Sequence, residues 1–576
     1  MKRIILLFLF AVSIQGMWAA IEKGKTYRIC PAAKPEKSLF VENASQDDKV
    51  PVYLWTETDV PAQQWTVKSM AGARITLVNT YSGKYLSVQN NKLVQGTKTS
   101  PIYWVLTEID AEKNIFTMAY NNKSPSVSSF DDGTQPTMGS EKMEWQFVEV
   151  EAQTEFNDVM RDRMAEGFLN QYLQNKGAGY RTFVNGGWGE SETQEAVLDM
   201  YEMTGENKYW LDYNYCYRYF KNKVGDNWTG GAKDGYHWYG YDFNDDVMWQ
   251  IIGAARAANI APSGNANFLA DAKRNFDAIY KRANLGYVQL LRWAESSGNR
   301  NGTNSCINGP AEVAACYIAI AAADESYFEI AKGLYNNQRT YLFNSSNGHV
   351  YDSVVLDPTT GKVVSSNTWA STYNQGTMLG AAVLLYQHYG NETYKRDADL
   401  IIKYAMENLC NADGIIKVCQ NADGDFQGFK GILMRYAGLY ARTFKDEKVS
   451  AWLIKNAFHA YNNMNSKHYG HSAWLTKATE DGKFATTKDG KPAYIDYTTQ
   501  AFGASTAISA AFAVPVPSVT DAIENINDDF CSTSSRSHFA GVYDLNGRRV
   551  SNEDGTLPTN LKKGLYIRNG RKIMVR

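Results

Sequence analysis

Residues 376–385 read Gly-Thr-Met-Leu-Gly-Ala-Ala-Val-Leu-Leu, a run without a charged side chain. The run lies inside a longer segment, 373–389, whose apolar residues recur at a spacing of three and four. Such spacing predicts a helix. Because the helix is apolar on every side, we expect other elements to surround it completely.

The same helical pattern extends over most of the chain. Twelve segments show it, at 154–174, 191–204, 207–223, 243–260, 265–283, 309–323, 325–341, 373–389, 393–408, 426–443, 447–463 and 496–513. The even-numbered segments of this series are the more apolar ones. Alternation of buried and half-buried helices predicts six inner–outer pairs closed into an (α/α)6 barrel over residues 154–514.

Residues 21–150 have a different pattern, with short strands and turns. Trp65, Trp104 and Trp145 recur about 40 residues apart, and a similar short segment precedes each of them, at 37–41, 84–88 and 123–127. Threefold repetition of strands predicts an all-β trefoil.

This region resembles the ricin-B-like lectin modules. Their Gln-x-Trp signature is intact only in the first repeat, at Gln63 to Trp65. Two interpretations stay open: an active lectin, or a trefoil whose tryptophans only fill its core.

The N-terminus has the pattern of a secretory signal peptide, which we assign to residues 1–20. Lys2 and Arg3 are followed by an apolar run over 4–12, and Ala19-Ala20 offers a small-residue cleavage site. We therefore expect the protein to be exported, to the periplasm, the cell surface or the medium.

The C-terminal part of the chain is polar and irregular over 515–539, which we interpret as a linker. Residues 540–576 then read as short strands with an Asn-Gly turn, a β tail. This tail resembles the C-terminal sorting segments of exported proteins from the Bacteroidetes.

Composition narrows the class of ligand. The net charge of −2 over 576 residues gives no electrostatic reason to expect nucleic acid or an anionic membrane as partner. No apolar run after the signal is long enough to span a membrane. Aromatic residues make up 13% of the chain. This content is typical of proteins that bind neutral, hydroxyl-rich ligands. It is equally typical of a large core with half-buried tyrosines.

The cysteines predict neither a disulfide framework nor a metal site. Seven are present, an odd and sparse number, and no Cys/His spacing resembles that of metal ligands. Cys410 and Cys419 could pair across a short hairpin; the alternative is that both are buried thiols.

The candidate catalytic pair is Asp245-Asp246, within the stretch Tyr-Asp-Phe-Asn-Asp-Asp-Val-Met-Trp at 241–249. Glycoside hydrolysis needs two carboxyl groups. When two carboxyl groups lie close together, the negative charge of one raises the pKa of the other. We expect Asn244 or Asp242 to cap the helix that begins here. Neighbouring side chains cannot spread far, which favours a retaining mechanism. The plainer alternative is an acidic helix start.

Four blocks in the chain resemble glycoside hydrolase family 76, the endo-α-1,6-mannanases. They lie at 241–257, 304–311, 373–376 and 427–432 with Arg435-Tyr436. The resemblance implies an (α/α)6 barrel and a retaining mechanism with Asp245 as nucleophile and Asp246 as acid/base. It implies no metal and no cofactor. The implied substrate is α-1,6-mannan, the backbone of fungal-type mannan, and we expect the enzyme to act as a monomer.

Further candidates for substrate binding lie at the starts of the even-numbered helices and in the loops beside them. We expect platforms for sugar rings, hydrogen-bonding amides and one cation: Trp188, Tyr241, Trp293, Tyr373, Phe429; Asn308, Asn374, Gln375; Lys430. For the aromatic residues the alternative is a place in the core, and for the amides it is bonding between helices. Lys430 is expected to pair with a catalytic carboxylate or with another acid inside the ring.

Two other functions remain open. The same barrel could hydrolyse another glycan, because such folds host many activities. The chain could also be a non-catalytic glycan-binding protein with an active trefoil.

Overall fold

The computed structural model describes residues 21–183, 187–223, 238–262, 264, 266–296, 301–420, 424–484, 495–496, 500–518, 542–543, 564–568 and 571–575. The chain divides into two compact units, Met1–Val516 and Pro517–Arg576. The proposed signal peptide and most of the linker lie outside the described residues.

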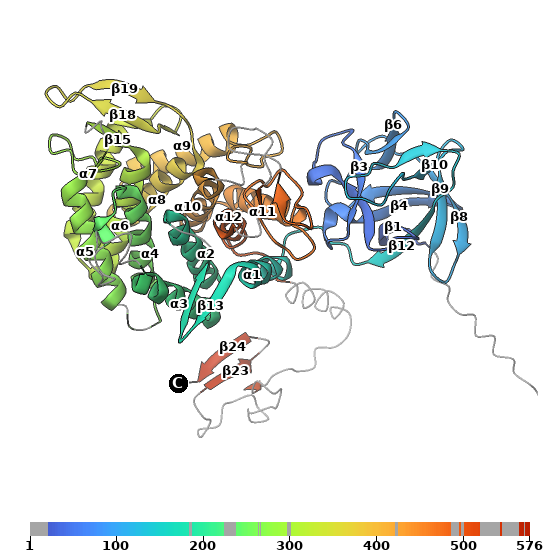
Figure 1. Cartoon of the computed structure of the whole chain (residues 1–576), viewed down its shortest axis with the longest axis horizontal. Helices are drawn as coiled ribbons and strands as arrows, with labels where there is room; N and C mark the ends of the chain where they lie inside the picture. Colours follow the sequence, from blue (N-terminus) through green and yellow to red (C-terminus); the bar gives the residue numbers. More distant parts are fainter. Residues whose placement is uncertain are drawn as a thin grey trace, which may run out of the picture. The chain divides into compact units, whose positions relative to one another are not determined.

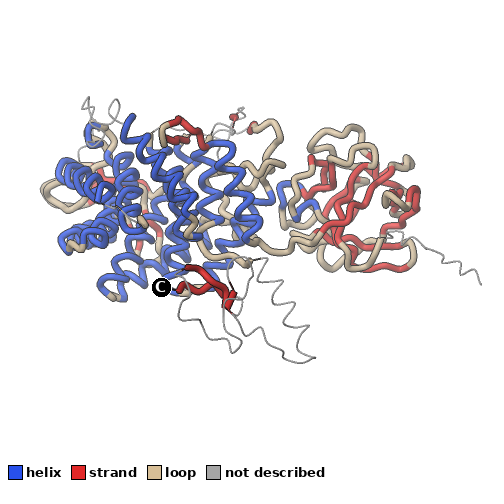
Figure 2. Tube along the Cα trace, turned by 90° about the horizontal axis from the view of Figure 1, so that it is seen from below, coloured by secondary structure: helices blue, strands red, loops and turns tan. Residues whose placement is uncertain are grey.

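Twelve α-helices in the described part of the first unit form two concentric sets (Figures 1 and 2). The inner set is α2 (Trp188–Thr204), α4 (Asn244–Ile260), α6 (Ser305–Ala322), α8 (Thr372–Tyr389), α10 (Phe429–Phe444) and α12 (Ala501–Ala511). The outer set is α1 (Asp158–Tyr172), α3 (Asn207–Lys223), α5 (Ala266–Ala283), α7 (Glu325–Tyr341), α9 (Glu392–Asn408) and α11 (Glu447–Asn462).

Contacts between the inner helices close a ring. Each even-numbered helix packs against the next one, and α12 packs against α2. Each odd-numbered helix packs on an inner neighbour: α3 on α2, α5 on α4, α7 on α6, α9 on α8, α11 on α10 and α1 on α12. The more apolar segments of the sequence are therefore the ones that the protein buries.

Five helices begin three or more residues from the predicted start. For α1 and α2 the difference is four and three residues, at Asp158 and Trp188. The segment predicted from 309 begins at Ser305, so that Pro310 lies inside α6. A proline in that position lacks the N–H that would bond four residues back, and this made it resemble a helix start. The predicted start at 426 is a separate 3₁₀ turn, η5 (Asp425–Gln427), before α10. The last helix begins at Ala501, and 497–499 lie outside the described residues.

Two glycines of the run at 376–385 let α8 and α10 pack closely. A Cβ on Gly376 would lie 2.8 Å from the Leu433 backbone, and one on Gly380 would lie 2.4 Å from the Tyr436 ring. Neither position has room for a side chain. Their spacing of four places both on the same face of α8.

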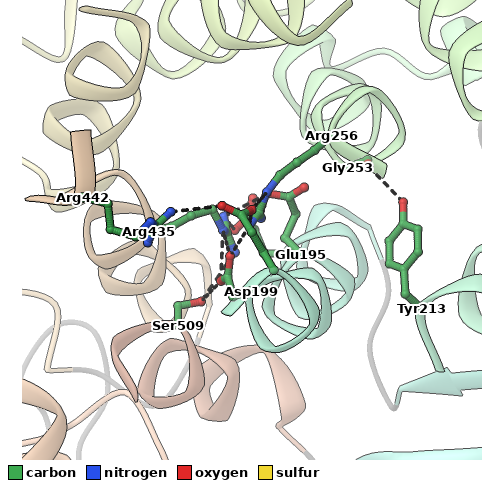
Figure 3. Close-up of polar contacts among 10 residues, drawn as sticks. Glu195, Asp199, Tyr213, Gly253, Arg256, Arg435, Arg442 and Ser509 are labelled. Carbon is green, nitrogen blue, oxygen red and sulfur yellow. Dashed lines mark hydrogen bonds and ion pairs between the residues drawn. The ribbon is translucent and has the colours of Figure 1, made fainter. Parts of the chain in front are cut away.

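A buried network of charges links four inner helices (Figure 3). Arg435 of α10 donates to Glu192 at 2.8 Å and to Asp199 at 3.0 Å, both on α2. Arg256 of α4 donates to the same Asp199 at 2.7 Å. Ser509 of α12 adds a hydrogen bond to Asp199 at 2.8 Å. Burial pushes the pKa of Asp199 upward, but the two guanidinium groups outweigh it, so the pKa is lowered and the carboxylate stays charged.

The N-terminal region consists of a closed six-stranded barrel and three hairpins. The barrel, in the order β1-β12-β9-β8-β5-β4, contains β1 (Thr26–Pro31), β4 (Trp65–Ala71), β5 (Arg74–Asn79), β8 (Trp104–Asp110), β9 (Ile115–Ala119) and β12 (Glu144–Val150). The hairpins pair β2 (Lys37–Val41) with β3 (Val52–Thr56), β6 (Leu86–Gln89) with β7 (Lys92–Gln95) and β10 (Ser124–Ser126) with β11 (Thr137–Gly139).

The three repeated tryptophans fill the core of this region and make equivalent hydrogen bonds. The indole N–H groups of Trp65, Trp104 and Trp145 donate to backbone carbonyls at 3.1, 3.2 and 3.2 Å. Those carbonyls, of Leu39, Leu86 and Pro125, stand at the same position in each of the three preceding segments. The tryptophans thus fasten each hairpin to the barrel.

The intact Gln-x-Trp signature is also internal. The Gln63 amide oxygen accepts hydrogen bonds from the backbone N–H and the hydroxyl of Thr58, at 2.9 and 2.8 Å. Its amide nitrogen donates to the Thr56 carbonyl at 2.9 Å. Both residues of the signature are therefore part of the packing, as in the second of the two interpretations.

The β-rich region shares a core with the helices. Phe40, Ala44, Val60 and Ala62 belong to the same buried apolar cluster as the inner ring. Short 3₁₀ turns, η1 (Glu42–Ala44) and η2 (Pro61–Gln63), carry two of these residues.

Small sheets complete the first unit. β13 (Leu173–Gly177) pairs with β14 (Tyr180–Phe183), β16 (Phe343–Asn344) with β17 (His349–Val350), and β20 (Lys483–Phe484) with β21 (Ile495–Asp496). β15 (Gly302–Asn304), β18 (Ser353–Leu356) and β19 (Val363–Asn367) form a three-stranded sheet. In the second unit, β22 (Val542–Tyr543), β23 (Gly564–Arg568) and β24 (Arg571–Val575) form another.

The six cysteines in the described residues are buried and free. Cys410 and Cys419 accordingly do not form the hairpin disulfide, and Cys531 lies outside the described residues. Of the helices described, α6 has the length and apolar composition of a membrane span, but it is mostly buried between α4 and α8.

Candidate active site

A cavity of about 340 Å³ opens where the inner helices begin. Five of the six inner helices contribute to its walls from their first turns or just before. The lining residues are Trp188, Tyr241, Phe243, Asp245, Asp246, Trp249, Trp293, Asn304, Cys306, Asp352, Tyr373, Asp425 and Phe429. The ring therefore brings together segments that are far apart in the sequence.

Asp245 and Asp246 lie in the first turn of α4 and both line the cavity. Successive residues of a helix point about 100° apart. At the end of a helix this does not separate them, because a cavity that crosses the helix terminus is open to both side chains.

The start of α4 is fixed by an arginine from the neighbouring helix rather than by a cap. Phe243 occupies the N-cap position and gives no side-chain hydrogen bond, so neither Asn244 nor Asp242 is the cap. Instead, Arg282 of α5 donates to the Asn244 side chain at 2.7 Å and to the Tyr241 carbonyl at 2.6 Å. The Asn244 amide donates to the Arg292 carbonyl at 3.1 Å. These bonds hold the helix start and the loop of Trp293 together.

Both carboxyl groups hold their protons more tightly than free aspartic acid does. Burial raises the pKa of Asp245 to about 7, and polar contacts with the Trp293 and Cys306 side chains act in the opposite direction. Burial also raises the pKa of Asp246, to about 8, and the charges of Asp245 and Asp425 add to this rise. Asp246 therefore keeps its proton to the higher pH, and Asp245 is the more readily ionised partner.

Aromatic rings form the walls around the pair. Tyr373 and Phe429 stack face to face, with centroids 3.9 Å apart and planes 9° apart. Trp188 packs edge-on against Phe502 at 4.5 Å, and its indole N–H donates to Asp425 Oδ1 at 2.8 Å. Flat apolar faces beside two carboxyl groups suit a ligand with both C–H faces and hydroxyl groups, as a sugar has.

The structure brings seven of the predicted site residues to the cavity: Asp245, Asp246, Trp188, Tyr241, Trp293, Tyr373 and Phe429. Trp293 remains 40% exposed at its edge, whereas Tyr373 and Phe429 are almost completely covered.

The three predicted amides do not reach it. Asn308 is buried, donating to the Thr303 hydroxyl at 2.8 Å and accepting from the Leu291 backbone at 2.9 Å. Gln375 is buried as well and accepts from the Val350 backbone at 2.7 Å. Asn374 lies behind Asp352 and donates to it at 3.4 Å. Their amides bond to other parts of the protein, as in the alternative interpretation of these residues.

Among the described residues, Lys430 forms an ion pair neither with Asp245 or Asp246 nor with another acid of the ring. Its ammonium group is buried, donates to the Ser472 carbonyl at 2.5 Å and lies over the Trp474 ring. Burial lowers its pKa to about 7. A side chain at a helix start can point into the cavity or away from it. The spacing of residues in the sequence does not show which of these directions it takes.

The sequence did not single out six of the lining residues as substrate contacts: Phe243, Trp249, Asn304, Cys306, Asp352 and Asp425. Four of them lie within the sequence blocks at 241–257 and 304–311, and their position next to the candidate residues could have identified them. Asp425 begins the turn before α10. Asp352 lies between the short strands β17 and β18, where no periodicity marks it.

No group of three or more His, Cys, Asp and Glu in the described part of the chain is arranged to hold a metal ion.

Comparison with known proteins agrees with this geometry. Residues 158–517 match the model of glycosyl hydrolase family 76, and residues 16–104 match that of the ricin-type beta-trefoil lectin domain-like family. None of the curated proteins matches the chain.

Among solved structures, the alpha-1,6-mannanase of Salegentibacter sp. HEL1_6 is 23% identical, with a TM-score of 0.50 over 62% of this chain and 99% of that one. An inactive variant of the same enzyme, with two consecutive aspartates replaced, is similar to the same degree over 62% of this chain and 98% of that one. That variant was solved with alpha-1,6-mannotetrose. At such identity the likeness shows the fold of the helical region. The family match covers more than half of the chain, so the protein belongs to glycosyl hydrolase family 76 and is a glycoside hydrolase.

Proposed function

We propose that this protein is an exported, retaining endo-α-1,6-mannanase that cuts the backbone of fungal-type mannan. The observation that carries the proposal is the placement of Asp245 and Asp246 on one cavity, between aromatic walls formed by Trp188, Tyr373 and Phe429. The two consecutive aspartates replaced in the inactive Salegentibacter enzyme, and its α-1,6-linked ligand, support both the pair and the linkage.

The raised pKa values favour a division of labour between the two carboxyl groups. Asp245, as carboxylate, attacks the anomeric carbon while Asp246 gives its proton to the glycosidic oxygen. The C–O bond to the leaving sugar breaks and an ester bond to Asp245 forms. Asp246, now ionised, takes a proton from water, and the resulting hydroxide displaces Asp245 from the anomeric carbon. Two inversions give net retention, and the pair returns to its starting protonation state.

The fold supports finer assignments. We take the closed ring of inner helices with its outer partners to be an (α/α)6 barrel, and the six-stranded barrel with three hairpins to be a β-trefoil. We take its tryptophans to be structural, because all three are buried. The apolar run near the N-terminus supports export, and we propose that the enzyme acts as a monomer on a polysaccharide.

The first test is incubation of the purified protein with linear α-1,6-mannan, followed by NMR of the anomeric protons. Early α-anomeric oligosaccharides of mixed length are the expected products. Early β-anomers would show an inverting mechanism and a distant base. Absence of cleavage by folded protein would favour one of the two other functions, another glycan or simple glycan binding.

Replacement of each carboxyl separates an enzyme from a binding protein. Asp245→Asn and Asp246→Asn are each expected to lower kcat by about a thousandfold or more while binding of mannan persists. Glu112→Gln, an exposed carboxyl of the β-rich region, serves as control and leaves kcat unchanged. The proposal would be contradicted if the wild type showed no turnover and the two variants lost mannan binding.

A further inference from the structure

A tryptophan outside the cavity continues one of its walls. Trp369, which follows β19 and precedes α8, is 38% exposed. Its ring lies 5.5 Å from that of Phe426 and 6.2 Å from that of Phe429, measured between centroids. Phe429 lines the cavity, so the exposed indole of Trp369 belongs to an aromatic cluster that reaches the cavity wall.

Trp369 is held in place by the same side chain that holds a residue of the cavity. Asn367 accepts a hydrogen bond from the Trp369 backbone N–H at 3.0 Å. The Asn367 amide donates to Asp352 Oδ2 at 3.1 Å, and Asp352 lines the cavity. The backbone of Trp369 is therefore tied to the site, and the indole packs on Phe426, before any ligand arrives, which reduces the entropy cost of binding.

A second exposed indole lies beside a different wall. Trp293 is 40% exposed and packs against Phe243 at 5.0 Å, immediately before the Asp pair. Trp293 thus belongs to the α4 side of the cavity and Trp369 to the α10 side. A cavity with an exposed indole beside each wall suits a chain that continues past the cut bond, rather than a ligand that ends there.

We propose that Trp369, backed by Phe426, is a platform for a mannosyl unit of the α-1,6-linked chain outside the cavity, remote from the bond that is cut. The proposal rests on the proposed function and names an additional binding position for the same substrate. The indole surface, which carries no charge, suits the C–H face of a neutral sugar ring. Binding energy gained at this platform lowers the activation barrier for hydrolysis of long chains. Chains too short to reach the platform are hydrolysed without this contribution.

The test compares substrate lengths. Wild-type protein, Trp369→Ala, Trp369→Phe and Val364→Ala are assayed on a ladder of linear α-1,6-manno-oligosaccharides. The measured quantity is the ratio of kcat/KM on the longest oligosaccharide to that on the shortest one cleaved. We expect Trp369→Ala to lower this ratio about tenfold, and Trp369→Phe to restore most of it. Val364→Ala, on the exposed face of β19, is the matched control and keeps the wild-type ratio.

The outcomes separate this inference from the proposed function. If wild-type protein cleaves the ladder and the ratio for Trp369→Ala equals that of Val364→Ala, the platform is refuted while the mannanase stands. An equal loss on all lengths would also refute it, because it would indicate a structural role for Trp369. If wild-type protein cleaves no member of the ladder, the proposed function fails, and the platform for this chain fails with it. Phe426→Ala provides a second variant, expected to reproduce the loss.

Discussion

At the scale of single residues, the proposed catalytic pair is held at a cost in stability. Burial and mutual repulsion raise the pKa of Asp246 to about 8. At pH values between the ordinary pKa of aspartic acid and this raised pKa, Asp246 keeps its proton in the folded protein but has lost it in the unfolded chain. The contribution of Asp246 to stability is therefore greatest at low pH and falls as pH rises.

Asp246→Asn removes this dependence, because an amide does not ionise. We expect the variant to match the wild type near pH 4 and to be more stable by on the order of 5 kcal/mol near pH 9. Urea unfolding across this range measures the difference. Glu112→Gln should show no such growth with pH, and a difference that shrinks as pH rises would contradict the raised pKa.

The rate of hydrolysis should depend on pH as a bell. In the proposed mechanism the active form has Asp245 ionised and Asp246 protonated. Their pKa values are raised to about 7 and about 8. Activity is expected to fall below the first value and above the second, and the two limbs belong to the pair rather than to either residue. Measurement of kcat/KM against pH checks this, and a profile flat above neutrality would exclude Asp246 as the acid.

The residues that line the cavity could be predicted where chemistry and local pattern coincide. Asp245-Asp246 and the aromatic residues at the helix starts are visible because a helix start is a sequence signal. Lys430 and Gln375 stand at such starts too but point elsewhere, and that depends on packing. Asp352 could not be predicted. Hydrogen bonds from Asn367 and Asn374 hold it at the cavity, and no spacing in the sequence reveals these bonds.

At the scale of elements, the charges between α2, α4 and α10 act as one group. Arg435→Met would leave Glu192 and Asp199 buried with less compensation. We expect a loss of about 3–5 kcal/mol in the free energy of unfolding. The loss should be smaller in acid, where the stranded carboxyls can take up protons.

Denaturant unfolding measures this loss, and Arg396→Met on the exposed face of α9 is the control. A loss no larger than that of the control would mean that the network adds nothing to stability. An apolar replacement that stabilised the protein would mean that desolvation outweighs the attraction between the charges.

The helices themselves were predictable to within a few residues, because each buries one face or all faces in a regular pattern. Starts were less predictable. Pro310 interrupts the pattern of α6 without ending the helix, and η5 looks like the first turn of α10 although it is separate. Those distinctions depend on neighbouring elements that the local sequence does not contain.

At the scale of the whole first unit, buried contacts join the β-rich region to the helices. Lys477, beyond α11, donates to the Thr58 hydroxyl at 2.9 Å and to the carbonyls of Asn462 and Met464 at 2.9 and 2.7 Å. The Asn462 side chain accepts from the Ala62 backbone at 2.9 Å. Together with the shared apolar cluster, these bonds predict a single unfolding transition for both parts.

Calorimetry tests the prediction. Lys477→Ala leaves three acceptors without their donor and should lower the single transition as a whole, by about 1–3 kcal/mol. Lys68→Ala, an exposed lysine on the β-rich region, should leave it in place. Two separate transitions, with only one affected by Lys477→Ala, would show that the two parts unfold independently.

This contact was beyond prediction from sequence. The threefold repeat predicted the β-rich region, and periodicity predicted the helices, each from local pattern. The contact between them depends on 3₁₀ turns and on the loop after α11, and neither has a recurring pattern.

The free thiols have a consequence for the conditions in which this protein can exist. Every described cysteine is buried and unpaired, and burial raises the pKa of Cys30 to about 12 and that of Cys410 to about 11. Such thiols are poor nucleophiles and exchange slowly. Reducing agents therefore break no bond that holds the described fold. We expect the protein to fold equally well with or without oxygen, and to be obtainable from a reducing cytoplasm without an oxidative step.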